Sequence, residues 1–390
     1  MTPFEAATHA DPYGYYSGLR RQSGLLFDAE LGLWIASDAR AVEAILGHAD
    51  CRVRPLNEPV PPALAQGAAG RIFGRLMRMN EGPQHLLPRV AIASALAAVG
   101  TESIADRVSR VVETLDNPFD NPFENLDELM FTLPVCVIAA LTGLPSGRLQ
   151  DVARLTRDFV ACLSPLSDEA QLGKANTGGA RLSELFSALL SDEGGSSGFL
   201  RHVRNGCEAM AGDDHETLVA NLIGLLSQTC EATAGLVGNS LVALHRNPQL
   251  LEDLQSEPMY VADLVAEVAR YDSPVQNTRR FVAKRCTIGG CVLEAGDTVL
   301  VLLASANRDP CANPDPDSFL LNRAQRRTFS FGSGRHACPG QQLALAVASE
   351  AILAWLHRQP ASLASPCRWR YLPSLNGRIP RFYPDQETAQ

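Results

Sequence analysis

The sequence predicts a mainly helical protein with a small β region toward its C-terminus, and three observations support this class. The longest helical pattern runs from about Asp214 to His245. Further amphipathic helical patterns fill residues 79–200. Residues 279–305 instead alternate apolar and polar side chains between Gly-Gly and Ala-Gly turns, which is typical of strands. The length of 390 residues allows one large domain or two ordinary ones.

The N-terminal third predicts short elements. Residues 31–46 (LGLWIASDARAVEAIL) predict a strand and then a helix. Ser37 or Asp38 would be its N-cap, because either side chain can accept a hydrogen bond from the first helical turn. Residues 55–78 are rich in Pro, Ala and Gly, which predicts a mobile loop.

The helical patterns that follow have clear boundaries. They are interrupted at residues 117–122 (NPFDNP) and 191–198 (SDEGGSSG), where Pro, Asn and Gly favour turns. The long helix should stop at the Asn-Pro pair 247–248, because a residue before proline disfavours helical backbone. Further helices are predicted over 258–271 and 341–358.

Composition excludes several classes of protein. A formal net charge of −9 argues against nucleic-acid binding. The N-terminus lacks the basic and apolar regions of a signal peptide. The longest apolar stretch, residues 129–144, contains Pro134 and is shorter than the roughly 20 residues of a membrane span. Ten cysteines without C-x-x-C spacing fit neither a disulfide scaffold nor a zinc module. We therefore expect a soluble, cytoplasmic protein.

One loop carries a specific chemical pattern. Residues 331–340 (FGSGRHACPG) fit F-x-x-G-x-x-x-C-x-G, which composition alone would almost never produce in one chain. Cys338 lies just before a predicted helix, whose N–H groups favour a thiolate. Gly334 and Gly340 allow backbone conformations and approaches that a Cβ would block, and Phe331 can shield the sulfur. The alternative is a buried structural cysteine.

This loop resembles the haem-binding loop of cytochromes P450, and the similarity extends over nearly the whole chain. The resemblance implies that Cys338 is the iron ligand of haem b (iron protoporphyrin IX), with Phe331, Gly334 and Gly340 shaping the cofactor site. It also implies one triangular, mainly α domain over residues 1–390 with a minor β region. The haem would lie between the long central helix and the helix after the cysteine loop.

Glu267 and Arg270 form an E-x-x-R pattern on the helix predicted over 258–271. The pattern is common by chance, but its position upstream of the cysteine loop is the family's. Residues three apart share a helix face, and the resemblance implies that this pair braces the core beneath the haem. The alternative is a surface ion pair.

Four basic residues match the family's haem-propionate partners. His85 and Arg89 are four residues apart and would share one helix face, although the start of their segment departs from the family's pattern. Arg280 and His336 are the other two, and Arg279 competes with Arg280. The resemblance implies that these side chains hold the propionates, because buried carboxylates need charged partners.

The long helix departs from the family at residues 228–233, where Gln-Thr-Cys-Glu-Ala-Thr replaces A-G-x-(D/E)-T-T. The acid is kept as Glu231, but Ala232 replaces the proton-relay threonine. Thr229 or Thr233 can supply a hydroxyl, since both can share the face of Ala232. A substrate hydroxyl, peroxide as oxidant, radical coupling without oxygen insertion, and ordered water alone are open alternatives.

The resemblance implies a bacterial-type monooxygenase, of the kind used in secondary metabolism, that oxidises a small, mainly apolar substrate with O2. Electrons from NAD(P)H would arrive through a ferredoxin or flavodoxin and its reductase, and we expect a monomer. A peroxide-using or radical-coupling enzyme, or a non-catalytic haem-thiolate sensor, is the alternative. The substrate-facing candidates are Leu64, Ile72, Phe73, Leu76, Leu225, Gln228, Thr229, Val275, Gln276, Asn277, Leu375 and Asn376.

Arginines cluster in the sequence shortly before Cys338. Arg323, Arg326, Arg327 and Arg335 predict part of a basic face that would steer an acidic electron donor, despite the negative charge of the whole chain. The alternative is a merely solvated cluster.

Overall fold

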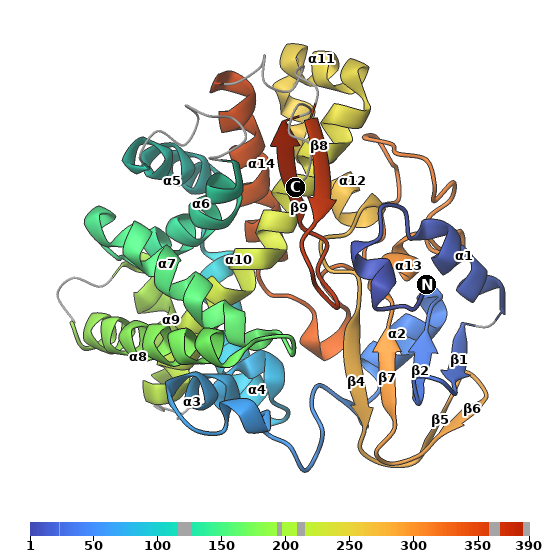
Figure 1. The fold of residues 1–390 in the computed structure, drawn as a ribbon. Coiled ribbons are helices and arrows are strands. Elements are labelled where there is room, and N and C mark those ends of the chain that lie inside the picture. The colour runs from blue at the N-terminus through green and yellow to red at the C-terminus, as the bar shows by residue number, and fades with distance from the viewer. Residues whose placement is uncertain (23, 116–125, 193–196, 209–214, 359–366, 385–390) are drawn as a thin grey trace. The chain divides into compact units, whose positions relative to one another are not determined.

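A computed structural model describes the chain except residues 23, 116–125, 193–196, 209–214, 359–366 and 385–390. The chain forms two compact units, which we describe separately (Figure 1). Unit 1 comprises Met1–Asn57, Gly235–Cys338 and Ile352–Gln390, and unit 2 comprises Glu58–Ala234 and Pro339–Ala351. The interruption predicted at 117–122, the centre of the one at 191–198 and the predicted helix start at Asp214 lie outside the described residues. The single-domain organisation stays a prediction.

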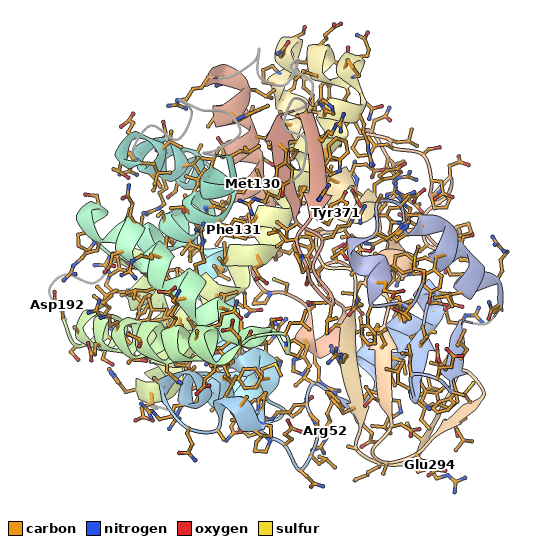
Figure 2. All side chains as sticks on the ribbon, viewed as in Figure 1. Arg52, Met130, Phe131, Asp192, Glu294 and Tyr371 are labelled. Carbon is orange, nitrogen blue, oxygen red and sulfur yellow. The ribbon has the colours of Figure 1, made fainter. Side chains whose placement is uncertain are left out.

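Among the described residues of unit 2, all the regular elements are helices. Its elements are η2 (Pro62–Leu64), α3 (Ala68–Arg75), η3 (Met77–Met79), α4 (Pro83–Ala97), α5 (Thr101–Thr114), α6 (Leu126–Leu141), η4 (Ser146–Arg148), α7 (Leu149–Val160), η5 (Ala161–Leu163), α8 (Glu169–Ser191), α9 (Gly198–Glu208) and the first parts of α10 (His215–Arg246) and α14 (Gln341–Arg358). Helix α7 packs against α6 and α8, and α4 packs against α9. The Arg157 guanidinium lies 5.3 Å from the Phe131 ring centroid, joining α7 to α6. Phe131 is labelled in Figure 2.

The loop predicted over residues 55–78 is wrong, because this segment contains η2, α3 and η3. Alanine favours a helix, and a side chain of α8 accepts a hydrogen bond from the first turn of α3. The Asn176 Oδ1 accepts a hydrogen bond from the Ala69 amide at 3.1 Å. A Cβ on Gly70 would lie 1.8 Å from the Leu64 carbonyl oxygen, so glycine permits this close turn. Local composition alone did not reveal these tertiary partners.

Unit 1 contains all the described strands. Its elements are η1 (Glu5–Thr8), α1 (Tyr13–Gln22), β1 (Leu25–Asp28), β2 (Leu33–Ala36), α2 (Ala39–Gly47), β3 (Cys51–Arg52), α11 (Pro248–Ser256), η6 (Pro258–Tyr260), α12 (Val261–Tyr271), β4 (Thr278–Val282), β5 (Cys286–Ile288), β6 (Cys291–Leu293), β7 (Thr298–Val301), α13 (Leu303–Asn307), η7 (Gly334–His336), β8 (Cys367–Tyr371), β9 (Pro380–Pro384) and the last parts of α10 and α14. The main sheet has the order β1-β2-β7-β4-β3, with β2 parallel to β7 and the other pairs antiparallel. Strands β5–β6 and β8–β9 form two antiparallel pairs.

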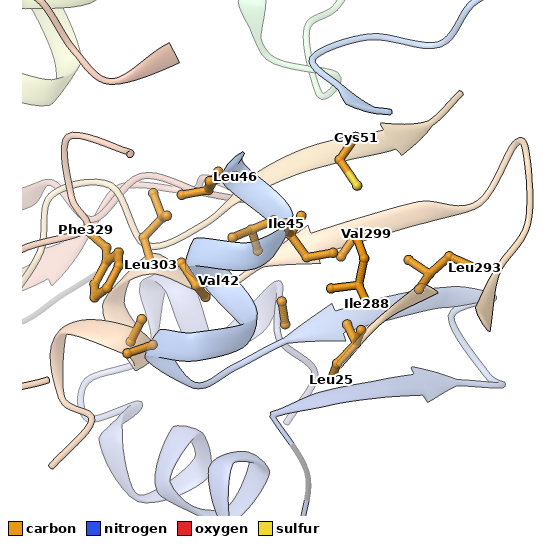
Figure 3. Close-up of a cluster of buried hydrophobic side chains, with 14 of the residues drawn as sticks. Leu25, Val42, Ile45, Leu46, Cys51, Ile288, Leu293, Val299, Leu303 and Phe329 are labelled. Carbon is orange, nitrogen blue, oxygen red and sulfur yellow. The ribbon is translucent and has the colours of Figure 1, made fainter. Parts of the chain in front are cut away.

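Helix α2 supplies much of the core of unit 1. The Asp38 side chain accepts a hydrogen bond from the Ala41 amide at 2.7 Å, so Asp38 is the N-cap of the predicted strand–helix segment. Three residues apart, Val42 and Ile45 then share one helix face. Both are fully buried in a cluster that also contains Phe329 from the base of the cysteine loop (Figure 3).

The mainly helical class with a minor β region is confirmed. Helix α14 has the bounds predicted for residues 341–358, and α10 ends within one residue of the predicted stop. Within the predicted strand region, residues 303–305 are wrong because they begin α13. The β region also includes β1–β3 from the N-terminal part of the chain. No helix among the described residues combines the length and apolar character needed to cross a bilayer.

Candidate functional site

The cysteine loop, residues 329–338, is shaped by glycine and by its own backbone. Gly332 and Gly334 have φ of +70° and +69°, which side chains with a Cβ rarely adopt. The Cys338 amide donates to the Phe331 carbonyl at 2.8 Å and closes the loop. The Cys338 side chain is exposed, so it is not the buried structural cysteine of the alternative interpretation.

Neighbouring segments of unit 1 hold this loop in place. A Cβ on Gly334 would lie 3.2 Å from the Leu46 carbonyl oxygen, so the loop and the end of α2 are in close contact. The Arg335 Nη2 donates to the His48 carbonyl at 3.0 Å. Helix α14 begins at Gln341, three residues after the cysteine. The thiol therefore precedes a helix N-terminus, where a negative charge is favoured.

Other metal-ligand side chains gather elsewhere in unit 1. The ligand atoms of His48, Cys51 and Cys286 lie within 4.8 Å of one another. Burial and the neighbouring Cys286 thiol raise the pKa of Cys51 to about 12, and burial also raises the pKa of Cys286. Cys51 belongs to the buried core cluster of unit 1 and Cys286 packs against it, whereas Cys338 is exposed, so Cys338 remains the candidate iron ligand.

Glu267 and Arg270 form a buried, bidentate ion pair on α12. The Arg270 Nη2 lies 2.6 Å from the Glu267 Oε1, and its Nε lies 3.1 Å from Oε2. Both side chains are fully buried. Glu267 also accepts hydrogen bonds from Arg323 at 3.2 Å and Arg326 at 3.0 Å. This pair is a core brace rather than a surface ion pair, and its position beneath the haem stays a prediction.

The arginines of the predicted docking face make contacts inside unit 1. Arg323 and Arg326 bind Glu267. The Arg327 Nη2 lies 2.5 Å from Glu43 Oε1, and Arg335 holds carbonyls of the segment after α2. Their charges are therefore largely committed to structural contacts, which is neither a free docking face nor a merely solvated cluster.

Strand β4 separates the two competing arginines, because successive side chains of a strand point to opposite faces. The Arg279 guanidinium lies 5.4 Å from the centroid of the Phe4 ring. Arg280 is buried, and its Nη1 donates to the Arg279 carbonyl at 2.9 Å. Since Arg279 is stacked on Phe4, Arg280 remains the propionate candidate of unit 1, together with His336 in η7.

In unit 2, helix α4 contains both His85 and Arg89, one turn apart as the spacing predicted. His85 is buried, and its Nδ1 lies 2.8 Å from the Met77 carbonyl oxygen. A carbonyl can only accept, so the imidazole proton lies on Nδ1 and the ring orientation is fixed. Arg89 is half-buried. Their contacts with a propionate stay predictions.

One face of α10 is accessible within a segment that is otherwise buried. Among residues 218–234, the side chains that are not buried are Leu225, Gln228, Thr229, Glu231 and Ala232. Their spacing places them on one helix face, which we call the α10 accessible face. Every one of them was predicted from the sequence to be catalytic or substrate-facing. The predicted Thr233 does not share this face, because its side chain is 1% exposed.

The segment between α3 and α4 is fixed to the same side of α10. The Asn221 Oδ1 accepts from the Met77 amide at 2.7 Å, and its Nδ2 donates to the Arg75 carbonyl at 3.0 Å. A Cβ on Gly224 would lie 2.8 Å from Leu76 Cδ2, so glycine allows the two segments to approach closely. These contacts of Asn221 could not be predicted from the sequence, since a lone asparagine in an apolar helix has no local pattern.

Arg78 brings a positive charge to the α10 accessible face. Its Nη1 donates to the Gln228 Oε1. Burial lowers the pKa of the Arg78 guanidinium, although the negative charge of Glu231 partly offsets this shift. Burial raises the pKa of the Glu231 carboxyl, although the positive charge of Arg78 partly offsets that shift. Both side chains keep accessible surface. Arg78 was not among the site residues predicted from the sequence.

Several predicted substrate contacts in unit 2 are buried in this structure. Leu64, Ile72, Phe73 and Leu76 are 2%, 4%, 8% and 1% exposed. They are the apolar side of η2, α3 and η3, which the loop interpretation had left free to face a ligand. All four are buried in unit 2, and their contact with a substrate stays a prediction.

The two amides predicted to contact substrate in unit 1 are buried and hydrogen-bonded to the backbone, and their contact with substrate stays a prediction. The buried Gln276 donates to the Ser273 carbonyl at 2.7 Å, and the buried Asn277 donates to the Leu375 carbonyl at 2.9 Å. Their polar groups are engaged because buried amides need partners. Val275 and Leu375 keep accessible surface and stay predictions.

A second buried ion pair was missed by the sequence analysis. The Arg378 Nε lies 2.6 Å from the Asp272 Oδ1, which also accepts from the Tyr13 hydroxyl at 2.6 Å. The Arg378 Nη1 donates to the His9 carbonyl at 2.5 Å, and its guanidinium lies 3.6 Å from the centroid of Tyr371 (Figure 2). This arginine joins both ends of the chain to α12.

Comparison with known proteins agrees with the cysteine loop and the fold. A family model described as Cytochrome P450 matches residues 214–358. Cytochrome P450 107B1 of Saccharopolyspora erythraea is 31% identical over 314 residues, covering 78% of this chain and 76% of that protein. Cytochrome P450 monooxygenase PikC of Streptomyces venezuelae is 29% identical over 90% of this chain and 84% of its own length.

Two solved structures show the same fold. P450BioI, in complex with an acyl carrier protein ligated to hexadec-9Z-enoic acid, has a TM-score of 0.81 and 25% identity. The match covers 95% of this chain and 97% of that one. CalO2 has a TM-score of 0.82 at 23% identity, over 98% of this chain and 99% of its own. The chain belongs to the cytochrome P450 family, whose cofactor is haem, and is a cytochrome P450 monooxygenase.

Proposed function

We propose that Cys338 binds the iron of haem b and that the enzyme oxidises a small, mainly apolar substrate with O2. Electrons would come from NAD(P)H through a ferredoxin or flavodoxin and its reductase. The observation that supports this most is the exposed Cys338 thiol, in a loop closed by its own amide and shaped by two glycines of positive φ.

The donor chemistry of each unit fits haem. Unit 1 offers an exposed soft thiol with His336 on the same loop, and the buried cation Arg280. Unit 2 offers His85 and Arg89 one turn apart on α4. A thiolate suits iron, and basic side chains suit the two propionates. When bound, haem supplies oxygen activation at its iron.

The α10 accessible face can position a substrate and hold protons. Leu225 and Ala232 offer apolar surface, and Glu231 offers an acid whose pKa burial raises, which makes it a better proton donor near neutral pH than an ordinary glutamate. The Thr229 hydroxyl donates to the Leu225 carbonyl at 2.8 Å. Thr229 can therefore accept a hydrogen bond from water, but must break this bond to donate.

We expect Thr229→Val to lower the product formed per NAD(P)H and to raise peroxide release, because the valine cannot position water beside Ala232. Glu231→Gln should lower turnover about 10²–10⁴-fold, the usual cost of losing a proton donor. Ala232→Thr should keep or improve coupling. Product, NAD(P)H and peroxide are measured together, on a substrate found by a spectral binding screen.

Thr177→Val is the matched control, because Thr177 is exposed on α8 and its hydroxyl also bonds to the carbonyl four residues earlier. Unchanged coupling in every α10 variant would leave ordered water as the proton source. Turnover with hydrogen peroxide alone that equals the full system would replace the O2 proposal with a peroxide-using enzyme. Ligand binding without any product would favour the sensor.

Arg89→Ala is expected to weaken haem retention by about 10- to 100-fold, as the loss of one charged hydrogen bond would. The ratio of haem to protein after incubation with a haem-scavenging apoprotein measures this. Arg201→Ala is the control, because Arg201 is exposed on α9. Equal haem loss from the two variants would contradict a propionate role for Arg89.

A further inference from the structure

We propose that Arg78 is an anion-binding residue and that the natural substrate is a monocarboxylic acid with an apolar body. The acid would bind at the Arg78 guanidinium beside the α10 accessible face. This inference rests on the proposed function, because it names the substrate class of the same site.

The backbone next to Arg78 is held in place by contacts of the two preceding residues. The residue before it, Met77, has its amide bonded to Asn221 and its carbonyl bonded to His85. Leu76 packs tightly against Gly224. The backbone from which Arg78 extends is therefore fixed against both α10 and α4, and a preorganised cation binds an anion at a lower entropic cost.

Most of the hydrogen-bonding capacity of Arg78 is unused. A guanidinium has five N–H donors. Arg78 uses one of them on Gln228, and no other residue in the described part of the chain forms a hydrogen bond or ion pair with its side chain. The fork of a guanidinium matches the two oxygens of a carboxylate, which gives a directional, bidentate contact.

The charges around Arg78 favour an acid with a single negative charge. Burial lowers the pKa of the guanidinium, which reports a cation with incomplete solvation. Such a cation is stabilised by an anion. Glu231 is near enough to interact with Arg78 but forms no ion pair with it, and its carboxyl disfavours a doubly charged phosphate beside it. A single carboxylate would neutralise the positive charge of Arg78.

The rest of the α10 accessible face suits an apolar body. Leu225 and Ala232 lie on this face, and Gln228, which accepts the hydrogen bond from Arg78, lies between them along the helix. An acid anchored at Arg78 would thus extend its hydrocarbon part along α10. Removing the anchor should weaken binding of the acid and leave binding of a neutral analogue unchanged.

The test compares acids with their methyl esters on the ferric holoenzyme. Dodecanoic, cinnamic and lithocholic acids, each with its methyl ester, give linear, aromatic and polycyclic bodies. Equilibrium dialysis and the ferric Soret change report binding. We expect at least one acid to bind about 10- to 100-fold more tightly than its ester. Arg78→Gln should abolish this preference, and Arg78→Lys should keep part of it. Arg71→Gln, exposed on α3, should leave it unchanged.

Three results would overturn the proposal: equal binding of acid and ester by the unchanged enzyme, a preference that persists in Arg78→Gln, or no binding in any pair. None of these affects the monooxygenase proposal, which fails separately if the reduced protein shows no thiolate-haem spectrum with carbon monoxide. Coupled oxidation of a neutral ligand would keep the proposed function and remove the acid class.

Discussion

Replacing Cys338 by alanine is expected to abolish the red-shifted Soret band of the reduced, carbon monoxide-bound protein. The band depends on thiolate donation to the iron, and Cys338 is the exposed thiol next to a helix N-terminus in a loop whose backbone is already fixed. Monooxygenase turnover should disappear with the band. Absorbance of the reduced, carbon monoxide-treated protein measures the first effect directly.

Cys311→Ala is the matched control, because Cys311 is also exposed but lies in a turn after α13. It should keep the full band and the turnover. A band that survives in Cys338→Ala, or that is lost in Cys311→Ala, would show that another residue is the iron ligand.

Glu267→Gln is expected to reduce the free energy of unfolding by about 3–5 kcal/mol, the usual cost of breaking a buried ion pair. The glutamine removes the charge that Arg270, Arg323 and Arg326 share, and leaves three guanidinium groups with no carboxylate between them. Denaturant unfolding of the holoprotein measures the loss. Asp151→Asn is the control, since its exposed pair with Arg154 should contribute only about 0.2–1 kcal/mol.

The same pair predicts a pH dependence. Burial raises the pKa of Glu267, but the hydrogen bonds and charge of Arg270 outweigh this and hold its pKa below the ordinary value. The unfolded chain then binds the proton more readily, so the stabilisation is fully present above about pH 4.3 and is lost as pH falls through the lower folded-state pKa. The difference in free energy of unfolding between the parent protein and Glu267→Gln should become smaller at acidic pH. A difference that grows on acidification would contradict a stabilising ion pair between Glu267 and Arg270.

Local patterns identified the elements whose neighbours along the chain determine them. Helix α14 and the end of α10 were predicted because their apolar periodicity and stop signals are local. The accessible residues of α10 were also found, since Ala232 stands out where the family has a threonine. Residues 55–78 were misread, because their helices depend on α8 through Asn176, more than a hundred residues away.

Long-range polar contacts escaped the sequence for the same reason. Asp272 and Arg378 are 106 residues apart, and nothing in either segment indicates the other. Gln276 and Asn277 were predicted to contact substrate, and no local pattern indicates that backbone carbonyls accept hydrogen bonds from both amides. Arg78 looked like an ordinary arginine between two methionines, and only its contact with Gln228 shows where its charge lies.

The division of the chain has a consequence for its synthesis on the ribosome. Unit 2 is almost one continuous stretch, Glu58–Ala234, whereas unit 1 is assembled from three separate stretches. Strand β2 gains its parallel partner β7 only after some 260 further residues have been made, and Arg378 reaches the His9 carbonyl later still. Until then the N-terminal strands expose an unpaired edge, which is prone to aggregate. While unit 2 folds, β1 can pair with β2, but the other edge of β2 has no partner, so chaperone binding would matter most in that interval.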